Sequence, residues 1–101
     1  MQIYNSKEDL RVVVRTPSAA VIDCSVTELE VEGPSGPRLI VAGLPPTLVG
    51  LAGTDLRLRK RDGTVIGVSV DWGSLVAVGR QVRVVAHSAS IRYLEPLRLV
   101  S

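Results

Sequence analysis

The sequence is poor in the side chains that enzymes and metal sites most often use. Its 101 residues include one cysteine, Cys24, and one histidine, His87. A lone cysteine excludes an internal disulfide and a zinc site of several cysteines, and a lone histidine excludes a metal centre of several histidines. No basic residue stands beside Cys24 to activate its thiol, and His87 is interpreted as a structural histidine. We therefore predict that the protein is not an enzyme and has no catalytic residue, metal site or cofactor.

Long apolar segments and nucleotide-binding motifs are also missing. No run approaches the roughly 18 apolar residues that a membrane helix needs. Residues 1–9 lack the apolar stretch of a secretory signal. Gly33 and Gly36 precede no helix that could present backbone N–H groups to a phosphate, so they form no phosphate-binding motif. The remaining composition, 46% apolar and 22% charged, is typical of one globular domain.

The aliphatic residues favour strands over helices. Phenylalanine is absent and only three residues are aromatic, whereas valine occurs 17 times against 12 leucines and 5 isoleucines. Because branching at Cβ makes valine stiff, it fits a pleated strand better than a helix. The nine glycines and six prolines supply turns between the strands. The composition therefore predicts an all-β fold.

Alternation of apolar and polar residues locates the strands. In residues 10–16, Arg11 and Arg15 share one face, and Leu10, Val12 and Val14 share the other. We expect further strands over residues 20–23, 27–32, 38–42, 47–51, 56–61, 65–71, 75–78 and 81–87. Gly53 and the pair Trp72-Gly73 are interpreted as breaks, and Asp62-Gly63 predicts a type I′ hairpin turn. Strands at this spacing are typical of a sandwich or a closed barrel.

The chain is expected to hold one folded domain with two short ends. We predict a flexible N-terminus over residues 1–9 and a β-sandwich domain over residues 10–88. Residues 89–101 contain leucines near helical spacing, with Pro96 where the first turn of a helix tolerates it. This segment is too short for a stable helix by itself, so residues 89–101 are interpreted as a helical stub.

Charged residues gather in rows of opposite sign. Residues 1–50 carry a net charge of −2 and residues 51–101 a net charge of +4. The acidic row is Glu28, Glu30 and Glu32, and the basic row is Arg57, Arg59, Lys60 and Arg61. A basic strand can bind nucleic-acid phosphates, but single-strand binders also stack bases on exposed aromatic residues, and the basic row has none. A small β-barrel that binds nucleic acid or another anionic partner is therefore the alternative hypothesis.

Two loops rich in glycine and proline carry the most specific motifs. The first contains Gly33-Pro34-Ser35-Gly36, and the second is Ala42-Gly43-Leu44-Pro45-Pro46. In that order, and with a later Ala86-His87-Ser88-Ala89 segment, they resemble the Gly-x-x-Gly, Pro-Gly-His-x-Pro and Ala-x-x-Ala motifs of one family. This family is the epsilon subunit of the F-type ATP synthase, called delta in mitochondria. The resemblance extends over about residues 10–95.

The resemblance implies a roughly ten-stranded β-sandwich in the central rotor of an ATP synthase. Such a subunit binds the gamma subunit and the membrane ring, as a peripheral protein on the cytoplasmic face of a bacterial inner membrane. It couples ion-driven rotation to ATP synthesis or hydrolysis in the catalytic head without forming a catalytic site. The residues that the resemblance assigns to gamma or the ring are Gly33, Pro34, Ser35, Gly36, Pro37, Arg38, Leu39, Gly43, Leu44 and Pro46. Leu39 and Leu44 could instead fold inward and cap the sandwich.

The chain departs from the family pattern at three places. Leu44 stands where the family has histidine, and Trp72 stands where it has the first glycine of a Gly-Gly turn. Residues 94–98 resemble the start of the family's C-terminal helical hairpin, but the rest of the hairpin is missing. We expect either a natural short form or a shortened chain.

Overall fold

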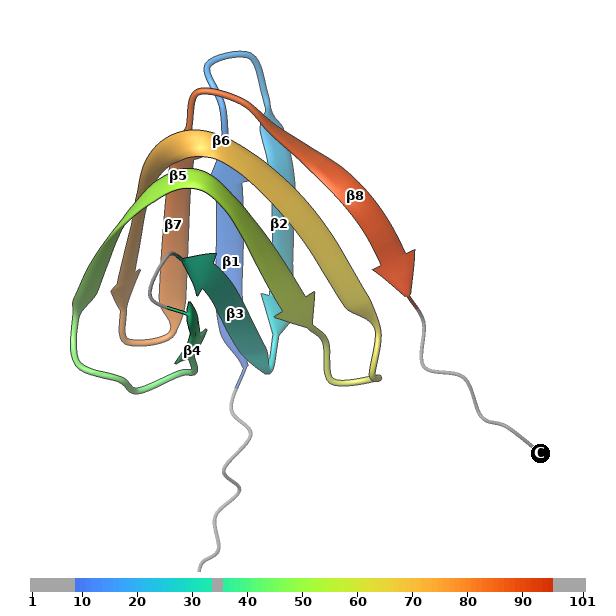
Figure 1. Cartoon of the computed structure of the whole chain (residues 1–101). Coiled ribbons are helices and arrows are strands. Elements are labelled where there is room, and N and C mark those ends of the chain that lie inside the picture. Colours follow the sequence, from blue (N-terminus) through green and yellow to red (C-terminus); the bar gives the residue numbers. More distant parts are fainter. Residues whose placement is uncertain (1–8, 34–35, 96–101) are drawn as a thin grey trace, which may run out of the picture.

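The structure, a computed structural model, describes residues 9–33 and 36–95. Every regular element in these residues is a strand, so the predicted all-β fold is confirmed (Figure 1). The strands are β1 (Leu10–Arg15), β2 (Ala20–Val26), β3 (Glu28–Gly33), β4 (Gly36–Ile40), β5 (Thr47–Arg59), β6 (Val65–Val78), β7 (Gln81–Ala86) and β8 (Ala89–Glu95).

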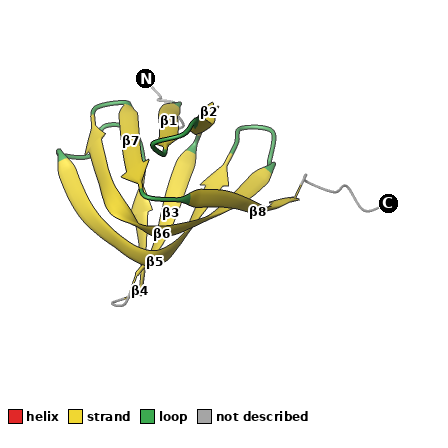
Figure 2. Cartoon of the chain, turned by 90° about the horizontal axis from the view of Figure 1, so that it is seen from above, coloured by secondary structure: helices red, strands yellow, loops and turns green. Residues whose placement is uncertain are grey.

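The strands form one continuous hydrogen-bonded sheet that folds over into two layers. Their order is β2-β1-β7-β6-β5-β3-β4, and β8 pairs separately with β6. All pairs are antiparallel except β1 and β7, which run parallel. Strands β5 and β6 curve strongly, so that the first half of β6 lies beside β8 and its second half beside β7 (Figure 2). These two strands therefore belong to both layers.

The curvature of β5 and β6 corrects the expected number of strands. We count eight strands rather than about ten, because the chain bends at Gly53 and at Trp72-Gly73 without leaving the sheet. Gly53 adopts a φ of 61°, which a glycine accepts without strain. At Gly73, a Cβ atom would lie 2.1 Å from the carbonyl oxygen of Val85, so only glycine lets β6 approach β7 this closely. Both glycines act as bends within a strand.

The connection between β5 and β6 also differs from the predicted type I′ turn. Such a turn needs a positive φ at both central residues. Only Gly63 has one, at 92°, and no residue other than glycine has a positive φ in the described chain. The Gly63 N–H donates to the carbonyl of Lys60 at 3.0 Å, and the Asp62 carboxylate accepts from the Thr64 N–H at 2.9 Å. The side chain of Asp62 thus stabilises a longer turn that needs only one glycine.

The core lies between the two layers and consists almost entirely of branched aliphatic residues. Strands β1, β3 and β7 contribute alternate residues to it, as the two-residue period predicts, whereas β4 contributes only Ile40 and β8 contributes no fully buried side chain. The largest fully buried side chains are Leu10, Leu29, Ile40, Leu56, Leu58 and Leu75, with Val12, Val14, Val26, Val68, Val70 and Val82. Thr27 and Thr54 are the buried polar residues in the described chain, and their hydroxyl groups hydrogen-bond the Arg59 carbonyl and the Ala52 N–H. The core therefore leaves neither hydroxyl group unpaired.

The C-terminal segment corrects the expected helical stub. Residues 89–95 form strand β8, which pairs with β6 from Val70↔Ala89 to Val65↔Glu95. Backbone pairing along β6 and the packing of Tyr93 over Gly67 hold this segment in a strand. Residues 96–101, the rest of that expected stub, lie outside the described residues, as do residues 1–8 of the expected flexible N-terminus.

Candidate functional site

The first predicted contact loop forms the tip of the hairpin between β3 and β4. Gly33 pairs with Gly36 at the end of the ladder, and Pro34 and Ser35 lie outside the described residues. Gly36, Pro37 and Arg38 are exposed, as is Leu39 with 53% of its surface accessible. Leu39 does not cap the core. An exposed leucine on an edge strand is available for contact with a partner.

The second predicted loop, residues 43–46, is attached to the turn between β6 and β7. Gly43 has a φ of 91°, and its N–H donates to the carbonyl of Gly79 at 3.0 Å. The hydroxyl of Thr47 donates to the carbonyl of Pro45 at 2.8 Å. Leu44 and Pro46 are exposed, so Leu44, like Leu39, points away from the core. These bonds fix a stiff loop that presents an apolar side chain.

The two loops do not meet. The hairpin tip and the loop at residues 43–46 extend from opposite ends of β4, which is five residues long (Figure 1). From the rise of a strand, four steps along β4 separate them by about 13 Å. The structure therefore places the predicted contact residues at two ends of one edge rather than in one compact patch.

A larger apolar surface lies on the outer side of the layer formed by β1, β7 and the adjoining halves of β6 and β5. We call it the outer apolar face, and its residues are Leu48, Val76, Val78 and Val85. Leu48 and Val76 are cross-strand partners, and Leu48 exposes 72% of its surface. Single exposed aliphatic residues are common, but four gathered on adjacent strands are typical of a binding surface. The Gly43–Gly79 bond joins the loop of Leu44 to the edge of this face.

Sequence reasoning missed the outer apolar face because its strands are apolar on both sides. Residues 75–78 and 84–86 read as unbroken apolar runs, which hide the alternation between buried and exposed positions. Those runs were the available signal. Near-continuous apolar runs are typical of strands that are covered on both faces.

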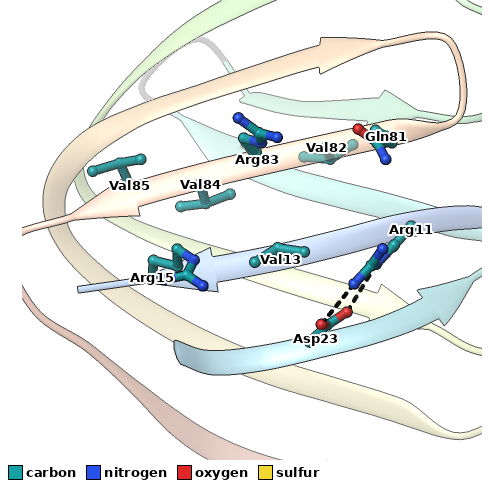
Figure 3. Close-up of a pocket in the computed structure, with 9 residues that line it drawn as sticks. All are labelled: Arg11, Val13, Arg15, Asp23, Gln81, Val82, Arg83, Val84 and Val85. Carbon is teal, nitrogen blue, oxygen red and sulfur yellow. Dashed lines mark hydrogen bonds and ion pairs between the residues drawn. The ribbon is translucent and has the colours of Figure 1, made fainter. Parts of the chain in front are cut away.

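Arginines of β1 and β7 lie on the same side of the sheet as the outer apolar face (Figure 3), and Arg83 is the cross-strand partner of Val76. Arg11 is held by Asp23 through two hydrogen bonds of 3.0 and 2.8 Å. This bond and the charges of Arg11 and Arg15 outweigh a smaller effect of burial and lower the pKa of Asp23. The side chains of Arg15 and Arg83 line the same groove, and neither side chain forms a hydrogen bond or ion pair with another described residue. Their charges are therefore available to acidic groups of a partner.

The acidic and basic rows of the sequence face each other across β3 and β5. Arg59 pairs with Glu28 at 3.2 Å and Arg57 with Glu30 at 3.9 Å, while Arg61 pairs with Asp9 at 2.8 Å. The first two pairs follow directly from the antiparallel register of β3 and β5, whereas Asp9 precedes β1 and meets Arg61 outside that register. Because these carboxylates offset the charge of the basic row, the row is a poor site for nucleic-acid phosphates.

The lone cysteine is not activated, and the lone histidine belongs to a polar cluster. Cys24 is half-buried against the core, and burial raises the pKa of its thiol, with the charge of Lys60 opposing it. Nδ1 of His87 lies 3.1 Å from a carboxylate oxygen of Asp71. Burial would raise the pKa of Asp71, but hydrogen bonds from Ser88, His87 and Trp72 outweigh it and hold that pKa far below its ordinary value. No serine or cysteine side chain hydrogen-bonds the His87 ring within residues 9–33 and 36–95.

The described residues lack two further features. They contain no cluster of three or more His, Cys, Asp or Glu side chains arranged to hold a metal ion. They also contain no helix of the length and apolarity that crossing a membrane requires.

Comparison with known proteins places the chain beside one family. Residues 9–92 match the family described as ATP synthase, Delta/Epsilon chain, beta-sandwich domain. Comparison with curated protein sequences gives no significant match.

Two similar solved structures come from mitochondrial ATP synthases. A chain of the Euglena gracilis OSCP/F1/c-ring assembly has a TM-score of 0.74 and 14% identity, over 82% of this chain and 53% of that chain. A chain of the Tetrahymena thermophila central stalk and c-ring has a TM-score of 0.59 and 13% identity, over 83% of this chain and 67% of that chain. The chain thus spans about half the length of the Euglena chain. At these identities the likeness shows the fold alone.

Proposed function

Since the chain belongs to the ATP synthase delta/epsilon family, we propose that it is a central-stalk subunit that binds the gamma subunit and the rotor ring. Its role is to transmit ion-driven rotation of the ring to the catalytic head, where ATP is made or hydrolysed. The observation that carries this proposal is the family match over residues 9–92, nearly all of the described chain. Both structurally similar chains come from assemblies that contain a c-ring.

A rotor element must transmit torque without deforming, and the fold suits that requirement. All eight strands share one hydrogen-bonded network, and β5 and β6 run through both layers. Bending one layer would therefore strain the other. Close-packed interiors have low compressibility, and the aliphatic core joins the layers throughout.

We assign gamma binding to the outer apolar face together with the loop that carries Leu44. The face combines exposed aliphatic residues with two arginines, since Arg83 is the cross-strand partner of Val76 and Arg15 is that of Val85. Apolar side chains together with arginine are typical of protein interfaces. The predicted contact residues of this loop are Gly43, Leu44 and Pro46. The stiff backbone at Gly43 lowers the entropy lost on binding.

We assign contact with the ring to the hairpin between β3 and β4. The residues proposed there are Gly33, Pro34, Ser35, Gly36, Pro37, Arg38 and Leu39. The separation of this hairpin from the loop at residues 43–46 supports two contacts made by different ends of β4.

We propose that the subunit is not catalytic and is peripheral to the membrane. The unactivated thiol of Cys24 supports the first point, as does the lack of a serine or cysteine side chain hydrogen-bonded to the His87 ring in the described chain. Family membership supports peripheral association with the membrane complex. The cytoplasmic face of a bacterial inner membrane is the proposed location.

The test measures binding of the purified subunit to the gamma subunit of the same synthase. Leu48→Asp and Leu44→Asp place a charge on the proposed surface, and we expect each to weaken binding by about tenfold or more. Because both side chains are exposed, the free energy of unfolding should change by less than about 0.5 kcal/mol. Ile91→Asp is the matched control, since Ile91 is comparably exposed on β8, outside this face. No binding by the unaltered subunit, or equal weakening by Ile91→Asp, would refute the assignment.

A further inference from the structure

A rigid aromatic cluster lies where β6 bends from one layer to the other. The rings of Trp72 and His87 stack with their centroids 5.1 Å apart and their planes 6° from parallel. Trp72 nevertheless exposes 60% of its surface. It is the only tryptophan of the chain. A large, exposed ring that is already held in one orientation is the type of residue on which interfaces depend most.

Asp71 holds this cluster in place. One carboxylate oxygen of Asp71 accepts hydrogen bonds from the backbone N–H groups of Trp72 and Ser88, at 2.6 and 2.9 Å. The other oxygen lies 3.1 Å from Nδ1 of His87. The backbone N–H of His87 also donates to the carbonyl of Trp72 at 2.9 Å. The carboxylate thus joins β6 to the start of the β7–β8 connection and orients the imidazole under the indole.

The cluster belongs to the same side of the sheet as the outer apolar face. On β6, Leu75 is buried and Val76 is exposed, and the two-residue period places Trp72 on the exposed side with Val76. On β7, Val85 is exposed, so His87, two residues later, lies on that side as well. Trp72 therefore stands at one end of the outer apolar face.

We propose that Trp72 is the anchor of the gamma-facing surface, and that His87 and Asp71 are positioning residues that keep its ring ready to bind. This inference rests on the proposed function and adds a residue to it. Stacking and hydrogen bonding order the indole before the partner arrives, so little conformational entropy remains to be lost on binding. An exposed indole left without a partner would keep a large apolar area in water.

The chemistry of the face also describes the partner. Its surface must offer an apolar recess for the indole and a flat aliphatic area against Val76 and Val85. Carboxylates placed among these aliphatic contacts would meet Arg83 and Arg15, which pair across the strands with Val76 and Val85. A protein surface meets all three requirements, since a recess for the indole must be fixed relative to the acidic groups.

The experiment measures the affinity of gamma for the full subunit and for Trp72→Ala. We expect Trp72→Ala to weaken binding about 30-fold, the effect of losing a hot-spot residue. Trp72→Phe should recover part of that loss, because a ring remains. His87→Ala should weaken binding by about three- to tenfold through loss of the stack. Ile91→Ala, on β8, is the matched control and should bind as the unaltered subunit does.

A second measurement reports on the ring itself. Incorporation of 5-fluorotryptophan into this subunit gives one ¹⁹F resonance, from position 72. Addition of unlabelled gamma should shift this resonance and reduce the exposure of the indole ring to solvent. A merely structural role of Trp72 would leave the resonance unchanged while lowering the thermal midpoint of the Trp72→Ala subunit.

The outcomes separate the two proposals. If the unaltered subunit does not bind gamma, both the proposed function and this inference are wrong. If the unaltered subunit binds gamma, but the affinity of Trp72→Ala is within about twofold of it or the ¹⁹F resonance does not move, only the inference is wrong. Dimerisation or binding to anionic vesicles that requires Trp72, with gamma affinity unchanged, would likewise overturn the inference and assign the anchor to another occupant.

Discussion

Replacement of Gly73 by alanine tests the close approach of β6 to β7, on which the curved shape of the sheet depends. A Cβ atom at this position would lie 2.1 Å from the carbonyl oxygen of Val85 and 2.7 Å from the Cα of Ala86. Both are backbone atoms of β7, so no side-chain rotation relieves the contact. The two strands must separate where β6 passes from one layer to the other.

The expected cost follows from that separation. Overpacking in a closely fitted region costs about 1–3 kcal/mol. Separation also stretches neighbouring hydrogen bonds, including the 2.9 Å bond from the His87 N–H to the Trp72 carbonyl. Each bond lost adds about 1 kcal/mol. We expect Gly73→Ala to lower the free energy of unfolding by about 2–4 kcal/mol, which corresponds to a thermal midpoint about 10–20 °C lower.

The assay is thermal and urea unfolding of Gly73→Ala beside a matched variant, Gly50→Ala. Gly50 lies on β5, the partner strand of β6, but a Cβ atom there has no neighbour within 4 Å. Gly50→Ala should therefore be neutral or slightly stabilising, because alanine restricts the unfolded chain. The reasoning is refuted if the two variants have the same midpoint, since the close approach would then have no energetic consequence.

Three further predictions concern the loops and the charged groups. Gly43→Val should lower stability by about 1–3 kcal/mol, because its φ of 91° strains a β-branched residue; an unchanged thermal midpoint would contradict this backbone conformation. The pKa of Asp71 is lower in the folded protein than its usual value of about 3.9, so its contribution to stability is complete above that pH and is lost as the pH falls through the folded-state pKa. Below about pH 4, the free energy of unfolding should therefore fall less steeply with decreasing pH for Asp71→Asn than for the unaltered protein, and equal slopes would exclude this role. Finally, a double-mutant cycle on the exposed pair of Glu28 and Arg59 should give a coupling energy of no more than about 1 kcal/mol, falling with added salt; a larger, salt-independent value would indicate a partner not included in the pair.

Local sequence patterns anticipated much of the fold. Alternation placed β1, β3 and β7 to within a residue or two, because side chains on a strand with one buried face must alternate. The loops rich in glycine and proline were found because few other residues adopt a positive φ or have a fixed φ, so these two residues mark turns in a sequence. Only the structure shows that the side chains of Leu39 and Leu44 are exposed, because a leucine beside a loop can point into the core or into solvent.

Patterns that depend on distant residues were not recoverable in the same way. The acidic row and the basic row were interpreted as two separate charged faces, yet the register of β3 against β5 places them side by side as ion pairs. Residues 89–95 were read as a helical stub from the spacing of their leucines, but pairing with β6 makes them a strand. In both cases the deciding contacts join residues at least 19 positions apart.

The sequence by itself determined that the protein is built of strands with an aliphatic core and stiff loops, because each of these properties depends on a residue and its near neighbours. Only the tertiary structure decided that Gly53 and Gly73 bend two long strands instead of ending them, since a glycine permits either result. It also decided which valines remain outside. Val76 and Val85 are exposed because the opposite layer covers only the inner side of their strands, and no local pattern records which side that layer will cover.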